Sequence, residues 1–304
     1  MESLTQKPKL LSIVGPTGSG KTALSIELAK TFRGEVISAD SRQVYRGMDL
    51  GTGKVTREEM AGVPHHLLDI ADPKTDLYTG SDFARNAGAA ITDIITRGKL
   101  PIIVGGTFFY TELLRGTMQS APVAPNPRLR AELEEKTVIE LYAMLAATDP
   151  RRAVVIDSEN KRRLIRALEI IDSLGVVPEV TPIESAYEWL TIGIAVPTEI
   201  LNERIRERII ERLNQGMIEE ISDLHTNGVS FERMEDFGLE YRYISRYLRG
   251  TLTREAMIEE LTNKTRQFAK RQRMWLKRDP SITWFPFPTD YEAVKESVQG
   301  FLAS

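Results

Sequence analysis

Residues 15–22 read Gly15-Pro16-Thr17-Gly18-Ser19-Gly20-Lys21-Thr22, a complete match to the phosphate-loop pattern G-x-x-x-x-G-K-[ST]. An apolar run at 10–14 precedes the loop, and a segment with helical character at 21–31 follows it. The glycines let backbone N–H groups converge on a phosphate, and the helix N-terminus adds a favourable dipole. In this pattern the lysine reaches the distal phosphate and the next hydroxyl ligates Mg²⁺. We therefore predict a di- or triphosphate site, with Lys21 on the phosphate and Thr22 on Mg²⁺.

The first hundred residues alternate between strand-like and helical segments. Apolar runs at 10–14, 35–39 and 100–104 predict strands buried on both faces, as in a parallel sheet. Helical patterns lie between them at 21–31 and 81–96. This order predicts an α/β fold similar to the phosphate-loop NTPases, with a doubly wound parallel sheet and a ligand crevice at the carboxyl ends of its strands.

A proline-rich stretch at 121–127 (APVAPNP) interrupts this alternation. Helical patterns follow it at 127–135, 138–147 and 160–174, and an apolar run at 191–196 predicts a return to the sheet. We therefore predict a core made of residues 1–121 and 187–304, interrupted by a helical insertion domain at 122–186. Helices are expected over most of 198–278, with a loose proline-containing tail before a short helix near 290–302.

The composition limits the class of protein. No apolar run approaches the roughly 20 residues of a membrane span, and residues 1–9 are too polar for a signal peptide. Cysteine is absent, which excludes disulfides, a thiol nucleophile and a cysteine zinc site. We expect a cytoplasmic protein without zinc or membrane contact; a monomer is expected, although no residue pattern specifies the oligomeric state.

Basic residues cluster locally, although the net charge is −3. The segment 264–278 carries seven Lys/Arg residues and no acid, and smaller clusters lie at 161–166 and 204–212. Arg162 and Arg166 fall opposite the apolar stripe of the helix expected at 160–174. Solvated helix faces alone can explain such runs, whereas a polyanionic partner would also explain why they recur.

A carboxylate follows the second predicted strand but not the third. Asp40 comes directly after the run at 35–39, whereas the run at 100–104 leads into Gly105-Gly106-Thr107. Energy-coupled ATPases and GTPases usually hold Mg²⁺ with an acid at such a strand end, so we do not expect that class. Asp40 suits a general base for a nucleophile that attacks the phosphate-bearing substrate. A capping or Mg²⁺-associated aspartate is the alternative.

Five stretches carry a more specific signal. They are 40–52 (DSRQVYRGMDLGT), 64–69 (PHHLLD), 104–107 (VGGT) with Tyr110, 162–169 (RRLIRALE), and 270–272 (KRQ) with Trp275. Together they resemble the tRNA dimethylallyltransferases, which prenylate the adenosine next to the anticodon, and the resemblance spans nearly the whole chain. The zinc finger of the eukaryotic branch requires cysteine, so the match is to the bacterial type. The chain departs from the family pattern at Gly18, Gly53, Arg212 and Glu240, where Ala, Ala, Met and Gly are usual.

The resemblance implies transfer of the dimethylallyl group from dimethylallyl diphosphate to N6 of adenosine 37 in tRNA, with release of diphosphate. The phosphate loop and Mg²⁺ would hold the diphosphate, and Asp40 would take the N6 proton. The target base must leave the anticodon-loop stack to react. Gln43 would pair with an adenine edge through its amide, and Ser41 and Arg42 would hold adjoining backbone or bases.

Two further features of the site remain open between alternatives. Arg204 and Arg208, one helical turn apart, either clamp the diphosphate or pair with glutamates of their own helix. Thr107 either donates to the phosphate, fixes the base, or simply forms a strand-end turn. On the first interpretation, the catalytic residues are Asp40, Thr107 and Arg208.

The resemblance and the basic clusters together give a predicted surface for the tRNA anticodon stem-loop. It comprises Asp40, Ser41, Arg42, Gln43, Arg162, Arg163, Leu164, Ile165, Arg166, Tyr241, Arg242, Lys270, Arg271 and Gln272. We interpret His65 and His66 as loop-fixing residues, because no third metal ligand accompanies them. Trp275 is expected in the core and not as a stacking platform.

Three other functions compete with this one. A small-molecule phosphotransferase would explain the phosphate loop and Asp40, but not the basic segments. An isopentenyltransferase for free adenine nucleotides would need no insertion carrying Arg162, Arg163 and Arg166. An RNA-binding module without catalysis would have no use for Lys21, Thr22 and Asp40 together.

Overall fold

The computed structural model describes residues 7–106, 108–179 and 181–304. It divides into two compact units, one formed by Met1–Arg115 with Glu184–Ser304 and the other by Gly116–Ile183. The second unit is closed at its base, because the Ile183 N–H donates to the Gly116 carbonyl at 3.0 Å. The sequence predicts an insertion at 122–186, and the contact of that insertion with tRNA stays a prediction.

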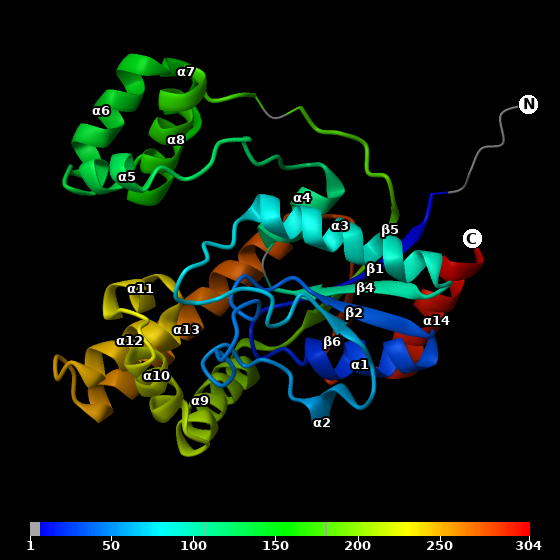
Figure 1. Ribbon diagram of the computed structural model, residues 1–304. Coiled ribbons are helices and arrows are strands. Elements are labelled where there is room, and N and C mark those ends of the chain that lie inside the picture. Colours follow the sequence, from blue (N-terminus) through cyan, green and yellow to red (C-terminus); the bar gives the residue numbers. More distant parts are fainter. Residues whose placement is uncertain (1–6, 107, 180) are drawn as a thin grey trace, which may run out of the picture. The chain divides into compact units, whose positions relative to one another are not determined.

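The first unit is built on a parallel sheet (Figure 1), which confirms the predicted α/β fold. Among the described residues, the sheet has six strands in the order β3-β2-β4-β1-β5-β6. The strands are β1 (Lys9–Val14), β2 (Gly34–Ser38), β3 (His65–His66), β4 (Leu100–Gly105), β5 (Glu188–Ala195) and β6 (Ile282–Pro286). Because they are parallel, the segments that follow β1, β2 and β4 meet at one edge of the sheet.

Side-chain alternation along the strands sorts the two faces of the sheet. Leu11 and Ile13 of β1 lie in one buried cluster with residues of α1 (Lys21–Thr31) and α14 (Tyr291–Ala303). Leu10 lies in a second cluster with α3 (Gly80–Thr96) and Tyr110 of α4 (Phe108–Arg115). Figure 1 shows α3 and α1 on opposite sides of the sheet. Burying each such aliphatic side chain contributes about 1.5–3 kcal/mol.

Most of the remaining helices in this unit extend the first cluster. They are α9 (Thr198–Asn214), α10 (Met217–Thr226), α11 (Phe231–Asp236), α12 (Leu239–Leu248) and α13 (Arg254–Leu276), and a short α2 (Arg57–Met60) lies in the segment after β2. α9 buries Leu201, Ile205, Ile209 and Leu213, which recur every four residues. One stripe of α9 therefore faces the core while the positions between these residues stay outside it.

The second unit contains α5 (Pro127–Glu134), α6 (Val138–Thr148), α7 (Pro150–Val155) and α8 (Lys161–Leu174), with a small core of its own. Within that core the buried Glu169 carboxylate binds Arg130 at 2.7 Å and Arg166 at 3.2 Å. An isolated buried carboxylate would be costly, so these two arginines stabilise the fold of the unit.

The prediction of a loose tail before α14 is wrong at one place. Residues Ile282–Pro286 form the edge strand β6, which pairs with β5 from Thr191 to Ala195. Among the described residues, no helix is long and apolar enough to cross a membrane.

Candidate functional site

The phosphate loop joins β1 to α1 through backbone conformations that favour glycine. Gly18 and Gly20 have φ values of 82° and 93°, in the left-handed region. A Cβ atom on Gly15 would lie 2.7 Å from Ser19 Oγ, so any larger residue there would force the buried Ser19 side chain to shift. Gly20 also precedes the first turn of α1, whose free N–H groups therefore border the loop.

Lys21 extends back inside this loop. Its Nζ donates to the carbonyl oxygens of Gly15 and Pro16, both at 2.9 Å. Burial of the ammonium lowers the pKa of Lys21 to about 8; the charge of Arg208 lowers it further and that of Asp40 opposes the change. A lysine, an arginine and a carboxylate therefore act on one another beside the loop. The Thr22 side chain, next along α1, is exposed.

Asp40 follows β2 and lies half-buried. Its Oδ1 accepts a hydrogen bond of 2.8 Å from the Arg42 backbone N–H, an Asx turn that fixes the carboxylate. This turn corresponds to the capping role that the sequence analysis gave as an alternative for Asp40. It is compatible with Asp40 acting as a general base. Among the described residues, the side chains of Ser41 and Arg42 make no hydrogen bond.

Gln43 is held at both ends of its amide. Ser38 Oγ donates to Gln43 Oε1 at 3.0 Å, and Gln43 Nε2 donates to the Gly53 carbonyl at 3.3 Å. Because Nε2 carries two protons, one donor remains for another group. A fixed amide beside Asp40 suits recognition of a base edge.

Arg204, Arg208 and Arg212 lie one turn apart along α9. The Arg204 guanidinium lies 4.7 Å from the centre of the Phe287 ring, and its Nη1 is buried without a partner among the described atoms. Desolvation and the charges of Arg212 and Arg204 lower the pKa of Arg208 to about 10. In the described part of the chain, no ion pair joins these arginines to the glutamates of their own helix, which favours an anion-binding role.

Gln272 joins the phosphate loop to the end of β4. Its Oε1 accepts from the Thr17 N–H and its Nε2 donates to the Gly106 carbonyl, both at 2.9 Å. Backbone groups occupy Oε1 and one of the two Nε2 protons, so Gln272 has a structural role, and its predicted tRNA contact stays a prediction. The KRQ match pointed to the residue but not to this role.

Tyr241 and Arg242 both have partners within the protein. Tyr241 is 1% exposed, and its hydroxyl donates to Glu220 Oε1 at 2.9 Å. Arg242 pairs with Glu235 at 3.0 Å. The buried Tyr241 side chain therefore holds helices together instead of facing a tRNA, whereas the predicted tRNA contact of Arg242, which is only half-buried, stays a prediction. Lys270 and Arg271 are exposed and form no ion pair among the described residues, so they are available to a polyanion.

Trp275 is not a core residue, contrary to the sequence-based expectation. It is 43% exposed and stacks on Phe108 with ring centres 6.0 Å apart. The Arg278 guanidinium lies 4.5 Å from the centre of the indole. α13 therefore combines an exposed aromatic side chain with basic residues, a combination that is typical of RNA-binding surfaces.

Residues 162–166 of α8 include both core and surface residues. Leu164 and Ile165 are 0% and 3% exposed, so they cannot contact tRNA as predicted. Arg162 and Arg163 are exposed. Arg166 donates to the Val123 carbonyl at 2.7 Å and pairs with Glu169, so it serves the fold of the unit.

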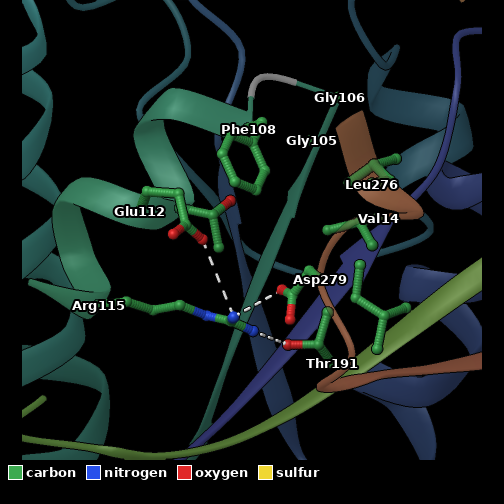
Figure 2. Close-up of a pocket in the computed structure, with 11 residues that line it drawn as sticks. Val14, Gly105, Gly106, Phe108, Glu112, Arg115, Thr191, Leu276 and Asp279 are labelled. Carbon is green, nitrogen blue, oxygen red and sulfur yellow. Dashed lines mark hydrogen bonds and ion pairs between the residues drawn. The ribbon is translucent and has the colours of Figure 1, made fainter. Parts of the chain in front are cut away.

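An ion cluster that the sequence did not suggest lies below the end of β4 (Figure 2). Arg115 of α4 pairs with Asp279 at 2.8 Å and also donates to the Thr191 hydroxyl. The cluster lines a small cavity with Gly105 and Gly106. It ties α4 and the segment after α13 to the sheet. Residues so far apart in sequence leave no local pattern. The predicted site residue Thr107 lies outside the described residues.

His65 and His66 have structural partners. His66 Nε2 lies 2.7 Å from Glu35 Oε2, and His65 Nδ1 lies 2.9 Å from the Val63 carbonyl. Within the described part of the chain, no group of three or more His, Asp or Glu residues could hold a metal ion by itself. Any Mg²⁺ at the loop therefore needs oxygen atoms from its substrate and from water.

Three positions that depart from the family pattern lie around one point of this site. A Cβ on Gly53 would lie 1.8 Å from Arg212 Nη2. Burial raises the pKa of Glu240, which Arg212 lowers and Asp40 raises. Arg212 and Glu240 therefore belong to the same charged region as Asp40 and Arg208.

Comparisons with known proteins agree on one family. The IPP transferase family model matches residues 43–279. The tRNA dimethylallyltransferase of Thermomicrobium roseum is 42% identical over 97% of this chain and 92% of its own length. That of Geobacter sulfurreducens is 38% identical over 97% of both chains.

Solved structures give the same result. A full-length tRNA isopentenylpyrophosphate transferase from Bacillus halodurans matches with a TM-score of 0.72 and 38% identity, over 98% of this chain and 96% of that chain. A eukaryotic dimethylallyltransferase studied acting on tRNA matches with a TM-score of 0.76 and 29% identity, over 92% of this chain and 74% of that chain.

Proposed function

This chain belongs to the IPP transferase family, and on that premise we propose that it transfers a dimethylallyl group from dimethylallyl diphosphate to N6 of adenosine 37 in tRNA, releasing diphosphate. The observation that carries the proposal is the group of charges around the phosphate loop. Lys21 and Arg208 supply cations at the loop, and Asp40 supplies a carboxylate beside them. Cations stabilise a leaving diphosphate, and a carboxylate accepts the proton of a nucleophile.

The donor substrate binds through its diphosphate. The loop N–H groups, Lys21 and the arginines of α9 hold this group as negative charge develops on it. The C1–O bond of the donor breaks, and its electron pair leaves with the diphosphate. Arg204 and Arg208 act as the clamp, because no glutamate of α9 pairs with either of them in the described chain.

The loop also fits Mg²⁺. The Thr22 side chain is exposed at the start of α1, and a single hydroxyl completed by phosphate oxygens and waters suits the coordination of this ion. When bound, the ion would neutralise charge on the diphosphate. Thr22 is the residue that would hold it.

The acceptor adenosine binds on the Asp40 side of the site. N6 attacks C1 of the donor, and the N6 proton passes to Asp40, whose carboxylate is held by the Arg42 N–H. Gln43, fixed by Ser38 and Gly53, donates its remaining proton to the adenine edge. The base reaches this position only when it leaves the anticodon-loop stack.

The exposed basic residues bind the tRNA backbone. Lys270 and Arg271 of α13, and Arg162 and Arg163 of α8, are the members of the predicted surface that remain exposed. Their phosphate contacts add affinity without sequence selectivity. We place the reaction in the cytoplasm and assign the activity to a monomer.

One experiment separates this function from its competitors. The protein is incubated with labelled dimethylallyl diphosphate and bulk tRNA, AMP or ATP, with Asp40→Asn as the matched control. We expect label in tRNA only, and almost none with the variant. Label in AMP or ATP would instead favour a nucleotide prenyltransferase, and no transfer to any acceptor would refute the proposal.

A further inference from the structure

Arg212 occupies a distinct place on α9, farther from the phosphate loop than Arg204 and Arg208. Gly18 of the loop approaches α9 at Leu201 and Ile205, to which a Cβ on Gly18 would lie 3.5 and 3.7 Å away. At 1.5 Å per residue, Arg212 lies about 16 Å along the helix axis from Leu201. Arg208 stands between them, because it acts on both Lys21 and Arg212.

Arg212, the last of the three α9 arginines, lies beside the residues that we assign to the acceptor adenosine. The Arg212 guanidinium lies against Gly53, where a Cβ would be only 1.8 Å from Nη2. The carbonyl of the same glycine accepts from Gln43. Gly53 thus contacts both the Arg212 guanidinium and the Gln43 amide, which we assign to recognition of the adenine. Its φ of 61° further favours glycine.

The described residues make no use of the N–H donors of Arg212. Among the described residues, this guanidinium makes no hydrogen bond and no ion pair within 4.0 Å, although its side chain is partly buried. Glu240 feels its charge from a greater distance. A guanidinium offers five N–H donors and no acceptor, so its partner must be an anion or a set of acceptor atoms.

We propose that Arg212 is a positioning residue for the acceptor strand, binding a phosphodiester group next to the target adenosine. The inference rests on the proposed function, because it takes Gln43 and Asp40 as the acceptor side. The diphosphate of the donor lies at the other end of the α9 row, so the RNA backbone is the anion that remains for Arg212. A guanidinium binds such a group through two parallel hydrogen bonds, which would fix the nucleotide while Gln43 reads its base.

The test compares Arg212→Gln with Arg206→Gln, a control on the exposed side of the same helix. Affinity for bulk tRNA is measured against salt, and affinity for inorganic diphosphate is measured separately. We expect Arg212→Gln to weaken tRNA binding about ten- to a hundredfold and to lower the salt slope by about one. Diphosphate affinity and the melting temperature should match those of Arg206→Gln. An unchanged salt slope, or an equal loss of diphosphate affinity, would overturn the proposal.

Gly53→Ala provides an independent test, since the added methyl group displaces the guanidinium without removing it. We expect this variant to weaken tRNA binding to a similar extent, and we expect no further loss when Arg212→Gln is added to it. Additive losses would show that the contact at Gly53 does not position Arg212. Both tests measure binding, so a failure of the prenyl-transfer assay would refute the proposed function without deciding the role of Arg212.

Discussion

Replacing Lys21 by Met tests whether the ammonium inside the phosphate loop is the titrating cation of the site. Its pKa is lowered from 10.5 to about 8 in the folded protein. Between these two values the unfolded chain holds a proton that the folded chain has lost, so the free energy of unfolding rises with pH. The slope is at most about 1.4 kcal/mol per pH unit, which gives up to about 2 kcal/mol between pH 8 and pH 9.5. Below pH 8 both states are protonated and the contribution is constant.

Urea unfolding of the wild type and Lys21→Met at several pH values measures this contribution. The difference in unfolding free energy between the two proteins should be constant from pH 6.5 to 7.5 and should change by up to about 2 kcal/mol from pH 8 to 9.5. All other titrating groups are common to both proteins and cancel in the difference. A difference that stays flat across the alkaline range would refute the reasoning.

Binding of inorganic diphosphate follows the same titration with the opposite consequence. The anion requires the charged ammonium, so the affinity of the wild type should fall as the pH rises above 8. Lys21→Arg keeps its charge throughout this range and controls for the ionisation of diphosphate itself. If the ratio of the two affinities does not change with pH, Lys21 is not the group responsible.

Four further outcomes are expected. Asp40→Asn should lower the rate of prenyl transfer about 10²–10⁴-fold while tRNA binding, measured by filter retention, stays unchanged. Thr22→Val should raise the Mg²⁺ concentration needed for half-maximal activity, and EDTA should abolish the activity; full activity in EDTA would exclude the ion. Arg271→Gln should lower the salt slope of tRNA binding by about one, whereas an unchanged slope would place the tRNA elsewhere. The Arg97, Lys99 and His66 side chains hold the pKa of Glu35 far below its usual value, so the stability that this group contributes above pH 4.5 should be lost as the pH falls below it. Glu35→Gln should lower the free energy of unfolding by about 1.5–3 kcal/mol at neutral pH. As the pH is lowered, this variant should lose less unfolding free energy than the wild type, which acid unfolding curves of both proteins measure.

The elements around the phosphate loop were predictable because their signals are local. The helix expected at 21–31 is α1 (Lys21–Thr31), and the strands expected at 10–14 and 100–104 lie within β1 and β4. Each combines a strong motif or an unbroken apolar run with a clear end. β6 had no comparable signal, because Ile282–Pro286 becomes a strand only through its pairing with β5. A short edge strand ending in proline resembles a loop when it is considered alone.

The errors at the tRNA surface have a different cause. Residues 162–166 were predicted as one continuous tRNA-binding stretch, although some of their side chains are exposed and others are buried in the core around α8. Leu164 belongs to the apolar stripe that the sequence itself shows, and it is fully buried. Tyr241 and Gln272 are fixed by Glu220, Thr17 and Gly106, which lie far from them in sequence. A resemblance to a family identifies segments of the sequence. Only the fold shows which residues of a segment pack within the protein and which can face a ligand.

The arrangement of the strand ends explains how a phosphate loop can support group transfer instead of hydrolysis. The end of β4 carries no acid and is tied by Gln272 to the backbone of the loop at Thr17. The carboxylate is supplied by Asp40 at the end of β2, which lies beyond β4 from the loop-bearing β1. In the proposed reaction, proton acceptance is thereby separated from phosphate binding, which we assign to Lys21 and the arginines of α9. An acid at the end of β4 would stand where ATPases and GTPases hold Mg²⁺ for hydrolysis, whereas in the proposed reaction Asp40 serves an incoming amine on the acceptor side.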